Sequence, residues 1–213
     1  FDISEAQGVP VMIRLVTRLS HSRSLVRPRE PRAQNGLRFG APADWTLLPS
    51  NARRRFRRLL DLQEGFVGLS ERSAFNALDL NPDDRRLGVI ASGIAHNYVM
   101  ENVRDLAAPP SLLKICTYPL AEGLVRKLVA HVDEVLVVEE GYPLVEETLK
   151  GVYGLPGKKL RGKLGGDLPL TGELSPETVR SALGLRPLDR LSLGGFTPAV
   201  RPPQLCQGCP QLI

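Results

Sequence analysis

Short apolar runs alternate with longer amphipathic stretches in the second half of the sequence, and this alternation constrains the fold more than any other feature. The runs that read as strands are residues 87–91, 112–116 and 134–139. The third run is apolar at four successive positions, as expected for a strand that is covered on both faces. Short loops between strands and helices require parallel strands joined by right-handed crossovers. The pattern therefore predicts an α/β fold with a three-layer, mostly parallel sheet.

Amphipathic stretches follow each of these predicted strands. The expected helices, which share apolar positions three to four residues apart, are residues 94–106, 117–132, 143–151 and 175–184. Pro143 stands at a helix start, where the N–H that proline lacks would have no helical acceptor. Ser175 is a residue type that caps the first turn of a helix, and Gly184 is typical of a helix end. Residues 159–163 are predicted to form an edge strand.

The N-terminal part of the sequence follows a different pattern. Residues 9–17 are apolar enough to be interpreted as a buried strand, and the polar side chains Arg18, Ser20, His21 and Ser22 follow it. Because α/β sheets bind ligands at the carboxyl ends of their strands, these side chains indicate either a site or an ordinary surface turn. Residues 26–49 contain four prolines and no periodicity, which predicts an extended connector, and an Arg-rich helix is expected from Pro49 to about Leu62.

The positive charge of the chain is confined to this N-terminal part. Residues 1–58 hold twelve Arg, no Lys and four acidic residues, a net +8, so the remaining 155 residues sum to −3. The densest cluster is Arg53, Arg54, Arg55, Arg57 and Arg58. On a helix these side chains spread around most of the circumference, and no aromatic stacking pattern or helix-turn-helix accompanies them. We expect a solvated helix or one docked on an acidic partner, and no nucleic-acid partner.

Several features bear on the compartment. The longest apolar runs are strand-sized, far short of the roughly 18 residues that a membrane span needs, so no membrane partner is expected. Three cysteines among 213 residues do not form a disulfide framework, which favours a reducing cytoplasm. The sequence starts without Met or a secretory signal and stops four residues after a Cys-x-x-Cys pair. We expect an excised piece of a longer cytoplasmic protein.

A search for complete catalytic motifs yields little. No G-x-G-x-x-G follows a strand, and there is no P-loop, H-E-x-x-H or G-x-S-x-G. His96 and His131 lie in predicted helices, where satisfied or surface histidines are expected. Cys116 closes a predicted strand and is expected to be a small buried hydrophobe. The carboxylates of Glu139 and Glu140 end the third strand, where a solvated strand end is favoured over a site.

The pair Cys206 and Cys209 carries more information. Two cysteines three positions apart, with a glycine between them, can direct both thiolates to one soft metal ion or iron-sulfur cluster. A complete site needs two further ligands, which the neighbouring sequence does not supply. Metal ligation, a redox dithiol and no special role therefore all remain open.

Several segments together resemble one known family. They are TRLSHSR (17–23), GVIASGIAHNY (88–98), TYPL (117–120), VLVVEE (135–140), TGELSPE (171–177) and PPQLCQGCP (202–210). Their order and content are similar to the alpha subunit of indolepyruvate ferredoxin oxidoreductase, and the similarity extends over nearly the whole chain. Residues 27–51 resemble the family least. Gln211 departs from the histidine that family members often have after this Cys-Pro.

The resemblance implies thiamine-diphosphate-dependent oxidative decarboxylation of an aryl 2-oxoacid, such as indolepyruvate, to an acyl-CoA. Electrons would pass through 4Fe-4S clusters to ferredoxin, and Mg²⁺ would hold the diphosphate. The implied partners are the beta subunit, ferredoxin, the 2-oxoacid and CoA. Most of this machinery would lie outside the chain, which is therefore expected to be inactive alone.

The resemblance also implies domain boundaries and site residues. Residues 1–25 would end a pyrimidine-binding domain, 26–84 would be the connector and Arg-rich helix, 85–195 a transketolase C-terminal-like domain, and 196–213 the start of a diphosphate-binding domain. Arg18, Ser20, His21 and Ser22 would line the substrate side, where a guanidinium suits a carboxylate. Cys206 and Cys209 match a cysteine pair that related oxidoreductases use for a cluster.

Two alternatives stay open. Another 2-oxoacid:ferredoxin oxidoreductase, acting on pyruvate or a branched-chain acid, would carry the same scaffold. A non-catalytic α/β interaction module would instead use the helix that contains residues 53–58 to bind an acidic partner or nucleic acid. The first alternative changes only the substrate, and the second removes the enzyme activity.

Overall fold

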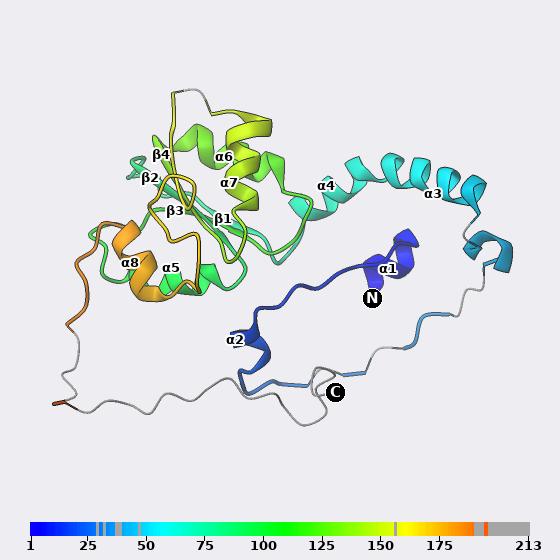
Figure 1. Ribbon diagram of the computed structural model, residues 1–213, viewed down its shortest axis with the longest axis horizontal. Coiled ribbons are helices and arrows are strands. Elements are labelled where there is room, and N and C mark those ends of the chain that lie inside the picture. Colours follow the sequence, from blue (N-terminus) through cyan, green and yellow to red (C-terminus); the bar gives the residue numbers. More distant parts are fainter. Residues whose placement is uncertain are drawn as a thin grey trace.

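The computed structural model describes residues 1–28, 30–31, 33–36, 40–46, 48–155, 157–189 and 194–195. A five-stranded sheet in the order β1-β3-β2-β4-β5 forms the centre of the larger body (Figure 1). The strands are β1 (Ala77–Asp79), β2 (Leu87–Ser92), β3 (Ser111–Ile115), β4 (Glu134–Val138) and β5 (Lys159–Arg161). Strands β2 to β5 run parallel, and β1 pairs antiparallel with β3 at the edge. The predicted α/β, mostly parallel fold is confirmed.

Helices cover both faces of this sheet, which gives the three predicted layers (Figure 1). Helices α5 (Ala95–Val103) and α8 (Pro176–Ala182) cover one face. Helices α6 (Glu122–His131) and α7 (Leu144–Thr148), the latter continued by the π-helical turn η2 (Leu149–Tyr153), cover the other. No helix in the described ranges is both long and apolar enough to cross a membrane.

Alternation along the strands divides the core into two clusters. Val89 of β2 faces α5 and α8, and its neighbour Ile90 faces α6 and α7. Both side chains are completely buried. A strand with both faces buried loses the polar and apolar alternation of a surface strand, which explains why β2 and β4 appear in the sequence as continuous apolar runs.

Gly88 lets α6 lie close to the sheet. A Cβ at this position would lie 2.8 Å from Cγ2 of Val132 and 3.2 Å from Leu128. Val132 is β-branched and therefore has little rotamer freedom with which to move away. The absence of a side chain at residue 88 is thus part of the packing between the central strand and α6.

The helix that ends the described body is capped as the sequence predicts. Ser175 precedes α8, and its hydroxyl accepts a hydrogen bond from the backbone N–H of Thr178, while Thr178 Oγ1 accepts from the N–H of Ser175. This reciprocal arrangement satisfies two N–H groups that would otherwise lack partners at the helix start. Strand β1 was not predicted, because three residues are too short for a recognisable alternation.

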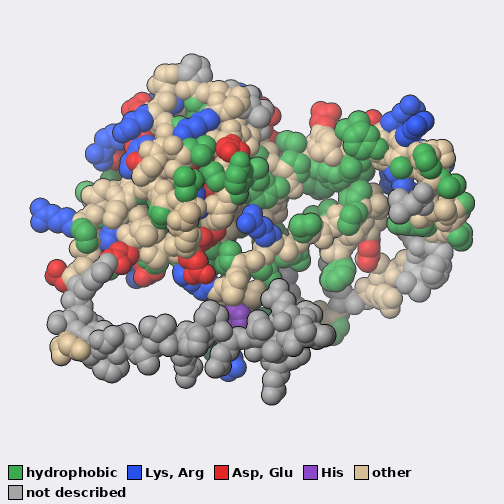
Figure 2. Space-filling view, in the orientation of Figure 1, with side chains coloured by type: hydrophobic (Ala, Val, Ile, Leu, Met, Phe, Trp, Pro, Cys, Tyr) green, Lys and Arg blue, Asp and Glu red, His purple; other side chains and the backbone are tan. Residues whose placement is uncertain are grey.

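The described N-terminal part adds α1 (Asp2–Gln7), α2 (Thr17–Ser20), the 3₁₀ turn η1 (Pro42–Trp45) and α3 (Pro49–Asp61). Helix α4 (Gln63–Glu71) then leads into the body. Helix α3 extends away from the sheet (Figure 1), which confirms the predicted Arg-rich helix. Hydrophobic side chains are exposed along this extension (Figure 2), among them Phe56 and Leu60.

The predicted strand at residues 9–17 is wrong for this structure. Residues 9–16 form no strand, and α2 starts at Thr17. Met12 and Ile13 are 92% and 80% exposed. A strand needs a neighbouring chain to accept its N–H groups, and no described segment pairs with this one. The connector prediction also needs a correction, because η1 interrupts the extended passage.

Candidate functional site

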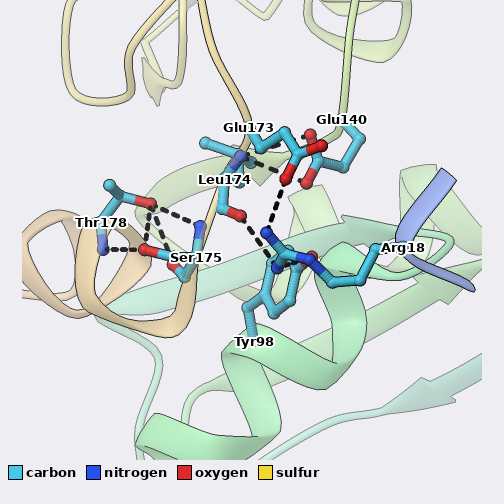
Figure 3. Close-up of polar contacts among 7 residues, drawn as sticks. All are labelled: Arg18, Tyr98, Glu140, Glu173, Leu174, Ser175 and Thr178. Atoms are coloured by element: carbon cyan, nitrogen blue, oxygen red, sulfur yellow. Dashed lines mark hydrogen bonds and ion pairs between the residues drawn. The ribbon is translucent and has the colours of Figure 1, made fainter. Parts of the chain in front are cut away.

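Polar loops from several elements meet at the carboxyl edge of the parallel sheet. β2 ends at Ser92, β3 leads into Cys116, and β4 leads into Glu139 and Glu140. Arg18 of the N-terminal segment reaches across to this edge from α2 (Figure 3). The sheet edge that α/β proteins use for ligands is therefore partly covered by a preceding segment of the same chain.

Arg18 connects three separate parts of this edge (Figure 3). Its Nη1 donates to the hydroxyl of Tyr98 at 2.7 Å, and its Nη2 donates to Oε2 of Glu173 at 2.8 Å. Nη1 also lies 3.4 Å from the carbonyl oxygen of Leu174. The guanidinium carbon is 5.5 Å from the centre of the Tyr98 ring. The hydrogen bond that Arg18 donates to Glu173 is the main cause that raises the pKa of Arg18.

Tyr98 is the partner that sequence reasoning missed. Tyr98 falls within the helix predicted at residues 94–106, but the sequence assigned it no role, although it lies one turn after the buried Ala95 on the same face. The ring is buried and the hydroxyl points toward Arg18 (Figure 3). Burial is the main cause that raises the pKa of Tyr98, so the phenol stays protonated. A buried tyrosine hydroxyl needs a hydrogen-bond partner, and Arg18 supplies one.

The loop before α8 is held on its other side by Glu140. Oε1 and Oε2 of Glu140 lie 3.2 and 3.4 Å from the backbone nitrogen of Leu174, which donates to them. The capping contacts of Ser175 begin at the next residue. Figure 3 shows this row of contacts from Glu140 through Leu174 to Thr178. Arg18 and Glu140 therefore fix the same loop from two directions.

A cavity of about 320 Å³ lies between the N-terminal segment and these loops. Its lining comes from four places in the chain: residues 14–18, Tyr98, residues 140–141 and residues 172–173. Two guanidinium groups, two carboxylates and one phenol thus surround a space of the size that small ligands occupy.

The other predicted substrate-binding residues do not line this cavity. The Oγ of Ser20 donates to the carbonyl of Val16 at 3.3 Å, and the Oγ of Ser22 donates to the carbonyl of Leu19 at 2.7 Å. His21 ends α2 and is exposed. The two hydroxyls satisfy local carbonyls around α2, and a role of Ser20, His21 and Ser22 in binding substrate stays a prediction.

Glu139 is buried, which corrects the expectation of a solvated strand end. Its two carboxylate oxygens accept hydrogen bonds from the backbone N–H groups of Val145 and Glu146, both at 3.0 Å. The side chain thereby fills the role of a cap for α7, whose first N–H groups have no helical acceptor. Burial is the main cause that raises the pKa of Glu139. The buried ammonium of Lys163 donates to the carbonyl of Gly141 at 2.6 Å and fixes the same loop.

Asn76 organises the loop after β3. Its Oδ1 accepts from the N–H groups of Cys116 and Thr117 at 2.7 and 3.1 Å. Its Nδ2 donates to Thr117 Oγ1 at 2.8 Å and to the carbonyl of Ser70 at 2.9 Å. This loop leads to Tyr118, whose hydroxyl lies 3.0 Å from Ser92 Oγ. One buried amide thus joins α4 to the loop after β3, and Tyr118 of that loop contacts the end of β2 through Ser92.

The remaining candidates have ordinary surroundings. Cys116 is exposed, so the expectation of a buried cysteine is wrong, because β3 ends one residue earlier. His131 contacts the carbonyl of Asn81 through Nε2 at 2.7 Å, as expected for a satisfied histidine. Burial, followed by the charge of Lys114, lowers the pKa of His96. Cys206 and Cys209 lie outside the described residues.

The arginines of α3 are partly engaged within the N-terminal part. Arg54 forms an ion pair of 2.6 Å with Asp44. Arg55 stacks on Trp45, with its guanidinium carbon 4.6 Å from the ring centre, and donates to the carbonyl of Asp44. Arg58 donates to the carbonyl of Gln7 in α1 at 3.1 Å. These contacts attach η1 and α1 to the helix.

The sheet and its edge define an α/β domain of the three-layer, mostly parallel class, joined at its carboxyl edge to a preceding segment. Indolepyruvate oxidoreductase subunit IorA of Methanothermobacter thermautotrophicus is 36% identical over 220 residues, which cover 99% of this chain and 35% of that protein. The chain is similar over almost its whole length to this group of oxidoreductase subunits, and the resemblance inferred from the sequence motifs is confirmed.

A second curated relative matches to the same extent. The IorA subunit of Archaeoglobus fulgidus is 31% identical over 226 residues, again 99% of this chain and 35% of that protein. The chain therefore spans about a third of the length of the curated relatives. A solved 2-oxoglutarate:ferredoxin oxidoreductase from Magnetococcus marinus matches 65% of this chain and 24% of its own, with a TM-score of 0.46 and 11% identity. No family model matches the chain.

Proposed function

We propose that this chain is the scaffold portion of an enzyme that oxidatively decarboxylates aryl 2-oxoacids, such as indolepyruvate, to acyl-CoA with ferredoxin as the electron acceptor. The names of the relatives, indolepyruvate oxidoreductase subunit IorA, support the reaction class. Because the relatives are named as subunits, we propose that the enzyme contains a second polypeptide, a beta subunit. The enzyme would work in the cytoplasm.

The observation that carries the scaffold role is the contact set of Arg18. One guanidinium joins the N-terminal segment to α5 through Tyr98 and to the loop before α8 through Glu173. Charged groups at the ligand edge of the sheet are thus used to hold two parts of the chain together. A domain built in this way orients what precedes it, while the reacting groups come from elsewhere in the longer protein.

The described residues do not fit thiamine diphosphate with Mg²⁺ or a 4Fe-4S cluster. A 4Fe-4S cluster takes four cysteine thiolates, and Cys116 is the one cysteine in the described ranges. Those ranges also contain no group of three or more His, Cys, Asp or Glu side chains suited to a metal ion. We therefore place these cofactors on other parts of the protein, and Cys206 and Cys209 remain candidate ligands.

The domain boundaries are part of the same proposal. Residues 1–25 would complete a pyrimidine-binding domain, residues 26–84 would connect it to the transketolase C-terminal-like domain at 85–195, and residues 196–213 would open a diphosphate-binding domain. The exposed apolar side chains of residues 11–15 support the first boundary, because such a segment gains stability when another sheet covers it.

The test is activity of the complete enzyme. The full-length protein that contains this chain, assembled with its partner subunit and thiamine diphosphate, should reduce a viologen dye when indolepyruvate and CoA are added. Pyruvate and 3-methyl-2-oxobutanoate serve as comparison substrates, and faster reduction with either would reassign the substrate. Absence of reduction with all three 2-oxoacids, in a preparation shown to contain cofactor, would contradict the proposal.

The exposed α3 helix supports one rival from a different class, a non-catalytic interaction module. Fluorescence anisotropy with a labelled DNA duplex at two salt concentrations distinguishes it. A helix that binds phosphates through Arg53 and Arg57 would lose affinity steeply with salt. We expect no binding to the duplex.

A further inference from the structure

We propose that the cavity between the N-terminal segment and the carboxyl edge binds a free α-amino acid, with the ligand's carboxylate on Arg14 and its ammonium on Glu140. Both residues line the same cavity of about 320 Å³. The proposal goes beyond the oxidative decarboxylation proposed above, and its test does not require the cofactors of that reaction.

Arg18 and Glu173 neutralise each other. Their ion pair is 2.8 Å long. The hydroxyl of Tyr98 and the carbonyl of Leu174 accept further hydrogen bonds from the same guanidinium. A ligand carboxylate that approached Arg18 would have to displace Glu173. The guanidinium that the sequence suggested for a substrate carboxylate is therefore already occupied by a carboxylate of this chain.

Arg14 is in the opposite situation. Within the described part of the chain its guanidinium has no hydrogen-bond acceptor and no carboxylate at ion-pair distance. Its Nη2 lies against Gly141, where an added Cβ would be 2.8 Å from that nitrogen. Gly141 also has φ of 71°, in the left-handed region that favours glycine. A cation thus lies against the loop that carries Glu140 with its donors unused.

Glu140 has unused acceptor capacity. It accepts one backbone N–H, that of Leu174, at 3.2 and 3.4 Å, whereas a carboxylate has about four acceptor positions. It forms no ion pair within the described ranges, with Arg14 or with Arg18. Arg14 and Glu140 therefore border the same cavity on either side of Gly141 without forming an ion pair with each other.

A zwitterion is the ligand that this arrangement fits. A simple carboxylate would gain Arg14 but would face the charges of Glu140 and Glu173, and a simple amine would face Arg14 and Arg18. An α-amino acid carries both charges on neighbouring atoms and can pair with both groups at once. Leu15 and Val16 also line the cavity, which favours an apolar side chain on the ligand.

Three ligands that share an indole ring separate the possibilities. L-Tryptophan carries both charges, tryptamine lacks the carboxylate, and indole-3-propionate lacks the ammonium. Isothermal titration calorimetry on the full-length protein should show L-tryptophan binding at least about tenfold more tightly than either of the others, since each lost pairing removes a charge-assisted hydrogen bond. Equal binding of L-tryptophan and indole-3-propionate would overturn the proposal in favour of simple carboxylate recognition.

Single-residue variants test the proposed contacts of Arg14 and Glu140 separately. Arg14→Gln should weaken L-tryptophan binding by about tenfold and should not weaken tryptamine binding, because a like charge is removed. Glu140→Gln should weaken L-tryptophan binding by a similar factor and, for the same reason, should not weaken indole-3-propionate binding. Arg23→Gln removes the same charge from an exposed position of the same segment and should change neither. Arg14→Lys keeps the charge and should retain part of the affinity. No binding of L-tryptophan to the wild type, or identical losses for Arg14→Gln and Arg23→Gln, would refute the site whether or not the oxidoreductase activity is found.

Discussion

The guanidinium of Arg18 donates a hydrogen bond of 2.7 Å to the hydroxyl of Tyr98, and 80 positions of sequence separate the two residues. The bond joins an N-terminal segment with little burial of its own to a helix that packs on the core. Glu173 and Leu174 complete the contact from a third part of the chain. The attachment of the N-terminal segment to the domain therefore depends strongly on the side chain of Arg18.

Replacement of Arg18 by Gln should release the N-terminal segment without unfolding the domain. The variant loses the ion pair with Glu173, while the core beneath Tyr98 keeps its apolar contacts. We expect several-fold faster chymotrypsin cleavage within residues 12–19 and an unchanged melting temperature of the domain. Arg23→Gln is the matched control. Equal cleavage rates for wild type and Arg18→Gln would show that other contacts hold the segment.

Replacement of Asn76 by Ala should destabilise the whole domain. The substitution removes the acceptor of the Cys116 and Thr117 N–H groups and the donor to Thr117 Oγ1. Because a buried amide partner is lost, we expect a decrease of about 3 kcal/mol in the free energy of unfolding. Urea denaturation followed by circular dichroism measures it. Asn97→Ala, at an exposed position of α5, should change it by less than about 0.5 kcal/mol, and a similar value for both variants would contradict the assigned role of Asn76.

Gly88→Ala should destabilise the domain through a clash with α6. The added Cβ would lie 2.8 Å from Val132 Cγ2, and we expect a loss of about 2 kcal/mol from overpacking. Val132→Ala removes the clashing methyl groups, so the double variant should be more stable than the sum of the single effects predicts, by at least about 1 kcal/mol. Strictly additive effects in urea denaturation would show that the two positions do not interact.

Titration of Glu139 should make stability fall as the pH rises. Burial raises the pKa of this carboxyl, the neighbouring charge of Glu146 adds to the rise, and the N–H groups at the start of α7 and the Lys163 ammonium oppose it. The folded state thus holds the proton more strongly than the unfolded state. This contribution to stability is fully present below the unfolded pKa and is lost as the pH rises through the folded one.

The corresponding variant is Glu139→Gln, which cannot titrate. The difference in unfolding free energy, wild type minus variant, should decrease as the pH rises above the ordinary pKa of a glutamate, about 4.3. Urea denaturation at a series of pH values measures the difference. Glu101→Gln, at an exposed position of α5, should show no comparable slope. A difference that stays constant with pH for Glu139→Gln would disprove the shift.

The prediction from sequence succeeded where residues act on near neighbours in the chain or on a buried surface. The apolar runs at β2, β3 and β4, the Ser175 cap and the Arg-rich α3 all appear where the pattern places them. The strand prediction failed at residues 9–17, because an apolar run indicates that burial is favourable but does not indicate whether another segment is present to cover it. Sequence reasoning also missed Tyr98, whose importance comes from a partner 80 residues away.

The amino-acid sequence by itself determined the alternation of strands and helices, the parallel sheet and its double cover, since these follow from local periodicity and from the need to bury apolar side chains. Only the tertiary structure decided which charges are free at the carboxyl edge. Arg14 and Arg18 carry the same charge in the sequence, but within the described residues folding brings Glu173 to ion-pair distance of Arg18 and brings no carboxylate that close to Arg14. Charge pairing depends on distances between remote segments, and no local pattern encodes them.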